Sequence, residues 1–180
     1  MNDEILDMSN LEEKTELLVR SIKETLISRG EMMATAESCT GGLIASDIVN
    51  EPGSSAVLAG GIVAYQNEVK ASLLEVPEDI LDKYGAVSEQ TVKAMAEGAR
   101  KKFNCEWAVA TSGIAGPTGA EPGKPVGFVW MCVASSLQNE PFYEIFDGNR
   151  HEIREKAVYR VLSKLKFLLN KQKSTCTNEH

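Results

Sequence analysis

The hydrophobic positions of the chain alternate between helical spacing and short continuous runs. Residues 9–29 place leucine and isoleucine side chains at helical spacing, and Gly30 can end that helix. Further helical patterns are predicted over residues 43–49, 67–74, 78–84, 88–103 and 149–169. Short apolar runs predict strands over residues 32–36, 56–65, 107–111, 126–134 and 142–146.

Strands that alternate with helices predict an α/β fold. We expect a three-layer α/β/α sandwich in a single domain, with a predominantly parallel or mixed sheet covered by helices on both faces. The length of 180 residues suits one domain. We assign residues 1–170 to that domain and residues 171–180 to a polar, disordered tail. Ligand sites in such sheets favour loops at strand ends, so we expect the functional residues in these loops.

Composition and charge exclude several classes of function. The formal net charge is -7 and the pI about 5.0, so we expect no nucleic-acid partner, which would need clustered basic residues. No apolar run reaches the roughly 20 residues that span a bilayer, so no membrane partner is expected. The N-terminus is acidic and lacks a signal-peptide pattern, which predicts a cytoplasmic protein.

Cysteine and histidine usage argues against a metal site. The 4 cysteines contain no CxxC pair, and reduced structural thiols are expected. Only 2 histidines are present, and His180 is the last residue. A histidine-dependent triad would therefore have to use His151, within the charged run GNRHEIREK.

The first loop with chemical potential is TAESCTGG, residues 35–42. It runs from a strand into a helix, and its glycines allow close backbone approach to a ligand. The helix N-terminus would present N–H groups to an anion, and Ser38 would lie at the mouth of that site. The alternative is a tight turn in which a serine or threonine only caps the helix.

The second loop, YQNEVK, begins where a predicted strand ends. Lys70 falls in the first two turns of the following helix. A lysine whose pKa is lowered by burial can act as a general base, and the Tyr65 hydroxyl can relay a proton. The alternative is an ordinary surface lysine on a helix.

The third loop, SGIAGPTG, holds three glycines and follows another predicted strand. Its backbone N–H groups can form a phosphate nest or an oxyanion hole, although it is neither a P-loop nor a GxGxxG fingerprint. The alternative is an ordered loop without a ligand.

Two arginines follow near the start of the last helix. Arg150 and Arg154 are four residues apart and share one helix face, so they can clamp a phosphate. The alternative is a solvated face on which they pair with Glu152 or Glu155.

The order of these segments carries more information than any one of them. TAESCTGG, GGIVAYQNEVK, GAVSEQTVKAMAEGAR, SGIAGPTG and KPVGFVW follow one another, and an arginine-initiated helix comes last. Over residues 15–168 the chain resembles the C-terminal domain family of the CinA competence-damage proteins. The resemblance implies a nicotinamide mononucleotide amidohydrolase that releases nicotinate mononucleotide and ammonia, needs no cofactor, and forms homo-oligomers.

The resemblance also implies residue roles. Ser38 matches the nucleophile, and Tyr65 and Lys70 match its proton-transfer partners. Either glycine-rich loop can hold the oxyanion while the other binds the phosphate, and the attack can come from Ser38 or from water that Ser38 orients. The expected substrate-binding residues are Thr40, Gly41, Gly42, Ser112, Gly113, Ala115, Gly116, Arg150 and Arg154.

Two positions depart from the family pattern. Asn149 stands where an acidic residue is expected, which weakens a salt bridge to Arg150, and Ser112 replaces a threonine but keeps the hydroxyl. Two rival functions remain open. One is an amidase for another small amide, and the other is a non-catalytic nucleotide- or protein-binding module linked to competence or DNA damage.

Overall fold

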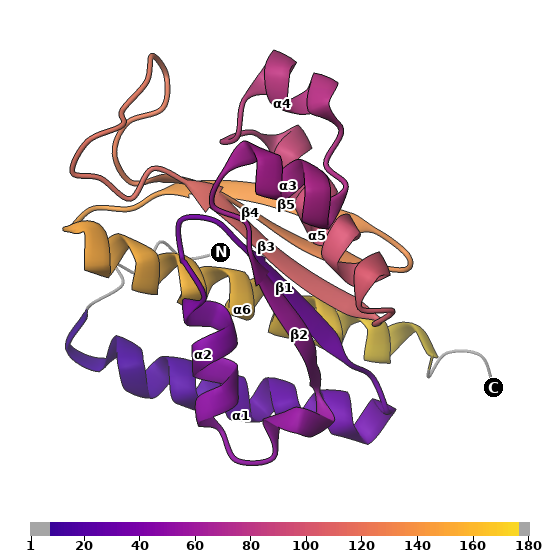
Figure 1. The fold of residues 1–180 in the computed structure, drawn as a ribbon. Coiled ribbons are helices and arrows are strands. Elements are labelled where there is room, and N and C mark those ends of the chain that lie inside the picture. Colours follow the sequence, from indigo (N-terminus) through magenta and orange to yellow (C-terminus); the bar gives the residue numbers. More distant parts are fainter. Residues whose placement is uncertain (1–7, 177–180) are drawn as a thin grey trace.

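A five-stranded mixed sheet forms the centre of the molecule (Figure 1). A computed structural model describes residues 8–176 of the chain. The strand order is β2-β1-β3-β4-β5, in which β1 pairs in parallel with β2 and β3, and β4 and β5 are antiparallel. The strands are β1 Met33–Glu37, β2 Leu58–Val63, β3 Trp107–Gly113, β4 Phe128–Ser135 and β5 Asn139–Ile145.

Helices cover both faces of this sheet, which confirms the predicted three-layer α/β/α fold (Figure 1). One layer holds α1 Leu11–Arg29, α2 Leu43–Asn50 and α6 Arg150–Cys176. The other layer holds α3 Asn67–Leu74, α4 Glu78–Tyr84 and α5 Glu89–Lys102. Two short 3-10 helices, η1 Met8–Asn10 and η2 Ser54–Ala56, complete the described elements.

The two faces of the sheet differ in side-chain size because residues alternate along each strand. The face under α1 and α6 carries bulky side chains such as Met33, Trp107 and Met131. The face under α5 is lined by alanines and Cys132, which lets this helix approach closely. Each face therefore has its own hydrophobic core.

Most elements end within a few residues of their predicted limits, with two informative differences. The strand predicted over 56–65 covers only Leu58–Val63, and its register to β1 shifts between Met33 and Ala34. A Cβ atom at Gly60 would lie 2.3 Å from the ring of Phe103, so this ring packs directly against the backbone of β2 where glycine leaves room for it.

The last helix is longer than predicted. Its expected end near Leu169 was wrong, because α6 continues to Cys176 and so includes residues 171–176 of the predicted tail. Asparagine, lysine and glutamine follow Leu169, without a glycine or proline to stop the helix. Residues 177–180 lie outside the described part of the chain.

One edge of the sheet collects the loops that matter for function. The carboxyl ends of β1, β2 and β3 meet there, together with the start of β4 and the end of β5 (left side of Figure 1). Within residues 8–176, no helix combines the length and apolar character that a bilayer crossing requires.

Candidate active site

Ser38 and Lys70 are brought together at this edge of the sheet. Ser38 directly follows β1, and Lys70 lies in the first half of α3, which follows β2. The Lys70 Nζ atom lies 3.3 Å from Ser38 Oγ. Lys70 is fully buried and Ser38 is 9% exposed. The prediction that these two residues share a site is therefore supported by their geometry.

The ammonium group of Lys70 has an unusual environment. Its Nζ also donates to the backbone carbonyls of Ala64, at 2.9 Å, and Tyr65, at 3.0 Å. Among the described residues, no carboxylate forms an ion pair with it. Burial lowers the pKa of Lys70, and the nearby Cys39 and Glu68 only partly oppose this effect.

The Ala64 and Tyr65 carbonyls determine which way the third bonding position of the Lys70 Nζ atom faces. A carbonyl oxygen can only accept, so each takes one N–H of the amine. In an uncharged amine those two bonds use both hydrogens, and the lone pair is left facing Ser38 Oγ. Lys70 is thus arranged to accept the Ser38 hydroxyl proton.

Cys39, beside Ser38, is unsuited as a rival nucleophile. Burial raises the pKa of its thiol to about 11, and its side chain is 6% exposed. A thiol with such a pKa is protonated near neutral pH and therefore unreactive.

Backbone N–H groups in the turn after Ser38 are bonded to a side chain of the protein itself. The Glu37 carboxylate accepts from the backbone N–H groups of Gly42, at 2.9 Å, Ile44, at 3.1 Å, and Ala45, at 3.0 Å. Gly42 is the N-cap of α2, and Ile44 and Ala45 lie in its first turn. The sequence predicted that N–H groups at this helix start would bind a substrate anion. The Gly41 N–H bonds the Ser38 carbonyl, so the N–H groups of Gly41 and Gly42 are both bonded within the turn, and the expected substrate contacts through these two residues stay a prediction.

Thr40 also points inward. Its side chain is fully buried, and its hydroxyl donates to Glu37 Oε2 at 2.8 Å. Since that bond uses its only hydrogen, the 2.7 Å bond to Thr111 Oγ1 must have Thr111 as donor. These bonds satisfy the Thr40 hydroxyl internally, and the expected substrate contact through Thr40 stays a prediction. Glycine is needed next to it, because Gly41 and Gly42 have φ of 62° and 96°.

The backbone carbonyl and the side-chain hydroxyl of Tyr65 bond different partners. Its carbonyl contacts Lys70, whereas its hydroxyl accepts from Arg150 Nη2 at 3.1 Å. The ring is 60% exposed. In this structure the hydroxyl is bonded to neither Ser38 nor Lys70, so its expected part in proton transfer stays a prediction.

The two arginines connect the loops around the site. Arg150 Nη1 donates to the Gly116 carbonyl at 2.7 Å. Arg154 donates through Nε to the Cys39 carbonyl, at 3.1 Å, and through Nη2 to the Thr40 carbonyl, at 2.7 Å. Neither arginine pairs with Glu152 or Glu155, so the alternative of a solvated, salt-bridged face is wrong.

Asn149 has a role that its sequence position left open. Its Oδ1 accepts from the backbone N–H groups of His151, at 2.9 Å, and Glu152, at 3.2 Å. Glu152 in turn accepts from the Asn149 N–H at 2.8 Å. This reciprocal arrangement is a capping box, so Asn149 fixes the start of α6 and with it the direction of Arg150.

The third loop divides into a structural half and an open half. The Ser112 hydroxyl is buried and donates to the Ala86 carbonyl at 2.7 Å, and Gly113 pairs with Val129 inside the sheet. Both residues are therefore engaged inside the fold, and the expected substrate contacts through Ser112 and Gly113 stay a prediction. Among the described residues, the N–H groups of Ala115 and Gly116 have no hydrogen-bond partner.

A cleft of about 680 Å³ lies beside this loop and the start of α6, and we call it the arginine cleft. Ser38 does not line it, but Arg154 bridges the cleft to the carbonyl of the next residue, Cys39. The lining residues are Ala115, Pro117, Val126, Gly148, Asn149, Arg150, His151 and Arg154.

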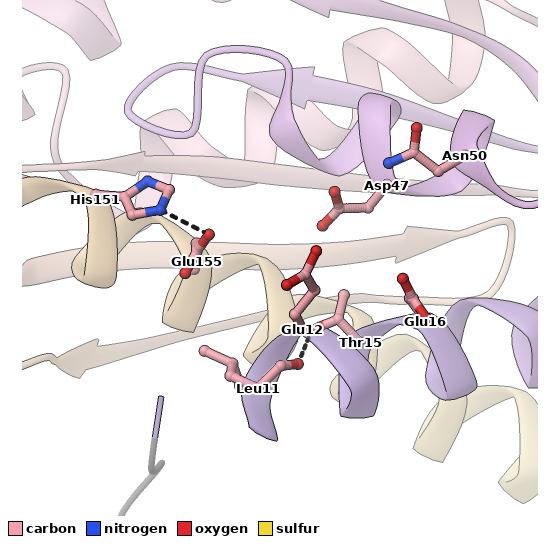
Figure 2. A pocket seen from close by; sticks show the side chains of 8 residues that line it. All are labelled: Leu11, Glu12, Thr15, Glu16, Asp47, Asn50, His151 and Glu155. Carbon is pink, nitrogen blue, oxygen red and sulfur yellow. Dashed lines mark hydrogen bonds and ion pairs between the residues drawn. The ribbon is translucent and has the colours of Figure 1, made fainter. Parts of the chain in front are cut away.

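A second cleft, of about 310 Å³, lies between α1, α2 and α6, and we call it the acidic cleft. Figure 2 shows its carboxylates pointing toward the same space. Burial, followed by the charge of Glu155, raises the pKa of Asp47 to about 6. The lining residues are Leu11, Glu12, Thr15, Glu16, Asp47, Asn50, His151 and Glu155.

Sequence reasoning missed Glu37 and Asp47. A glutamate at the end of an otherwise apolar strand, followed by a glycine pair, was the available signal for Glu37. Asp47 gave no signal, because its neighbours come from three helices. Within residues 8–176, no three His, Cys, Asp or Glu side chains are grouped so that they could hold a metal ion.

Comparison with known proteins identifies the family of this site. The model of the CinA C-terminal domain matches residues 15–169. The chain belongs to the CinA C-terminal domain family. It is 46% identical over 157 residues to a CinA-like protein of Thermotoga neapolitana, covering 87% of this chain and 37% of that protein. It is 45% identical over 142 residues to a CinA-like protein of Synechococcus, covering 78% of this chain and 34% of that one.

Solved structures of the CinA family share the fold. One is the competence damage-inducible protein A of Klebsiella pneumoniae, with a TM-score of 0.84 and 35% identity over 87% of this chain and 97% of that one. Another is a competence/damage-inducible protein of Agrobacterium tumefaciens, with a TM-score of 0.81 and 40% identity over 87% and 96%. This CinA domain spans about a third of the length of the curated relatives it matches.

Proposed function

We propose that this CinA domain hydrolyses the carboxamide of nicotinamide mononucleotide to nicotinate mononucleotide and ammonia. The observation that carries the proposal is the buried Lys70, which has no carboxylate partner among the described residues and faces Ser38 Oγ at 3.3 Å. Such a pair can activate a hydroxyl nucleophile without histidine or metal.

In the proposed mechanism, uncharged Lys70 accepts the Ser38 proton as Oγ bonds to the carboxamide carbon. The carbonyl electrons move to oxygen, and the tetrahedral intermediate forms. That intermediate expels its nitrogen together with the proton carried by Lys70, which releases ammonia and leaves an ester on Ser38. Water then attacks the ester, Lys70 transfers the water proton to Oγ, and nicotinate mononucleotide leaves.

The assignment of the two anion sites follows from the occupied turn. Because Glu37 takes the N–H groups at the start of α2, that turn cannot serve the oxyanion or the phosphate. We assign the oxyanion to the N–H groups of Ala115 and Gly116, and the phosphate to the arginine cleft. Arg150 and Arg154 supply the positive charge there.

The test is ammonia release from nicotinamide mononucleotide by the wild type and by Ser38→Ala and Lys70→Ala. Both variants should lose most activity while keeping nucleotide binding. Ser46→Ala on α2 and Lys93→Ala on α5 are matched controls, because both positions lie away from the site. An inert wild type that binds the nucleotide would favour a binding module instead.

Two further measurements separate the remaining alternatives. Equal hydrolysis of nicotinamide, which lacks the phosphate, would favour an amidase for another small amide. Intact-mass measurement during turnover distinguishes an ester on Ser38 from direct attack by water, since only the ester adds mass to the protein.

A further inference from the structure

Glu37 combines burial, charge and position in a way that the proposed mechanism does not use. It is the last residue of β1, directly before Ser38, and only 1% exposed. Among the described residues, no lysine or arginine forms an ion pair with it. A buried carboxylate without a cation must be stabilised by hydrogen bonds, because burial in a low-dielectric interior strongly disfavours its negative charge.

Four donors supply that stabilisation. Oε2 accepts from Thr40 Oγ1, Gly42 N and Ile44 N, and Oε1 accepts from Ala45 N at 3.0 Å. Three of the four are backbone N–H groups of α2 and its cap, whose helix dipole also favours a negative charge. The carboxylate therefore ties the end of β1 to the start of α2 across the turn that carries Ser38.

The same turn is held from its other sides. The Ser38 N–H donates to the Thr111 carbonyl of β3 at 3.0 Å. Thr111 also bonds Thr40, which bonds Glu37, so β3 and Glu37 are joined through one hydroxyl. Residues 38–42 are thus fixed at both ends by groups that contact neither Lys70 nor the arginine cleft.

We propose that Glu37 is a positioning residue, which sets the place of Ser38 Oγ relative to Lys70. This proposal rests on the proposed function, because it assumes that Ser38 is the nucleophile. A helix cap alone requires only a neutral acceptor such as serine or asparagine. The charged carboxylate gives stronger bonds and fills its acceptor sites with four donors, which restricts the turn more tightly.

The decisive variant is Glu37→Gln, which keeps the shape but replaces one acceptor oxygen with a donor. The amide nitrogen would oppose either the Ala45 N–H or the group of donors on Oε2. We expect kcat per folded molecule to fall about 10²-fold, the size of effect that a 1 Å misplacement produces, with KM changed less than about 2-fold. The pH of half-maximal rate should stay unchanged, because Lys70 keeps its surroundings.

The matched control is Glu31→Gln, just before the other end of β1. Glu31 accepts from Trp107 Nε1 at 2.8 Å and lies near Arg29, far from Ser38 along the strand. The same change of charge there should lower the melting temperature but leave kcat unchanged. An equal loss of kcat in both variants, or none in Glu37→Gln, would overturn the positioning role.

A second pair of variants tests the same proposal if the Glu37→Gln variant does not fold. Thr40→Val keeps the volume but removes the hydroxyl between Glu37 and Thr111, whereas Thr40→Ser keeps it. We expect the valine variant to lose about 10-fold in kcat and the serine variant to recover most of it. Equal activity of the two would contradict the proposal.

Labelling of Ser38 by a fluorophosphonate probe separates this proposal from the choice of substrate. We expect Glu37→Gln to slow adduct formation by the same factor as kcat, measured by mass spectrometry. A wild type that is labelled at Ser38 but releases no ammonia would refute the substrate and leave the positioning role testable by labelling alone. A wild type with an inert Ser38 would overturn both proposals.

Discussion

Helix α6 separates two clefts of opposite charge, and its first turns contribute to both. Arg150 and Arg154 line the arginine cleft, whereas Glu155 lines the acidic cleft and His151 lines both. Successive residues of an α-helix are rotated by about 100°, since 3.6 residues make one turn. An offset of one residue therefore turns a side chain from one cleft toward the other.

The clefts differ in how their charges are held. Both arginines donate to backbone carbonyls of loops that surround the serine–lysine pair. In the acidic cleft, the carboxylates of Glu12, Glu16 and Asp47 accept no hydrogen bond from any residue within 8–176. Burial, followed by the negative charge of Glu155, raises the pKa of Asp47. The comparison teaches that the side chains around the proposed nucleophile are held by hydrogen bonds, whereas the charges of the acidic cleft are not, and this difference supports placing the proposed reaction on the side of the arginine cleft.

The largest expected effect tests whether Lys70 acts as a base or only as a cation. Lys70→Arg keeps the charge, but a guanidinium does not lose its proton in proteins. We expect ammonia release to fall about 10³-fold, within the range for removal of a general base. A rate close to wild type would show that a positive charge at position 70 is sufficient for the reaction, and it would contradict the assignment of Lys70 as the general base. Lys93→Arg on α5 is the matched control.

The pH dependence sharpens the same point. In the proposed mechanism the uncharged form of Lys70 is the reactive one, so the rate should rise with pH. Burial holds the pKa of Lys70 below its usual value of 10.5, and the midpoint of the rise should lie below that value. A rate that falls as pH increases through this range would contradict the scheme.

The next effect concerns the bridge from the arginine cleft to the serine turn. Arg154→Lys can keep only one of the two bonds to the Cys39 and Thr40 carbonyls, because lysine lacks the planar fork. We expect kcat to fall about 10-fold through a looser serine turn. Arg160→Lys, on the same helix but bonded to Glu144, is the control and should leave kcat unchanged.

The sequence predicted that Ser38 and Lys70 lie close together, because their meeting depends on topology. Strand and helix patterns placed Ser38 and Lys70 after two strands, and parallel strands bring their carboxyl ends to one edge. The three-layer fold followed from the same patterns. The length of α6 was missed because nothing in the polar residues after Leu169 marks whether a helix continues.

The direction of side chains and the use of N–H groups were not predictable in this way. Thr40 and Ser112 have the residue types of a binding loop, yet their hydroxyls bond Glu37 and Ala86 inside the fold. Whether a helix N-terminus is free for an anion depends on a competing carboxylate, and a one-letter pattern does not show which way Glu37 points. The acidic cleft joins three helices, and only packing brings them together.

A moderate effect on stability is expected in the acidic cleft. The pKa of Asp47 is about 6 in the folded chain, above its usual 3.8. The unfolded chain therefore loses this proton first, and stability falls as pH rises from about 4 to about 6. Asp47→Asn should remove that dependence and raise the free energy of unfolding at pH 7 by about 1–2 kcal/mol, after allowance for solvent screening.

The measurement for Asp47 is chemical unfolding at several pH values. Asp82→Asn, on the exposed surface of α4, is the control and should keep the wild-type pH dependence. If the free energy of unfolding of the Asp47→Asn variant depended on pH as that of the wild type does, other groups of the acidic cleft would be its cause. Ammonia release should not change, because Asp47 lies outside the reactive side.

The smallest effect comes from Glu155→Gln, where two contributions oppose each other. The variant loses the ion pair with His151, whose side chain is 69% exposed, so the loss is only about 0.2–0.5 kcal/mol while His151 carries a proton. It also removes the second-largest cause of the raised pKa of Asp47, which favours the folded chain at neutral pH. We expect the free energy of unfolding at pH 7 to stay within about 0.5 kcal/mol of wild type, while a carboxyl-carbon NMR titration shows the pKa of Asp47 moving toward 3.8. An unmoved pKa would mean that Glu155 does not contribute to it, and the four carboxylates of the acidic cleft would then not act as one coupled group.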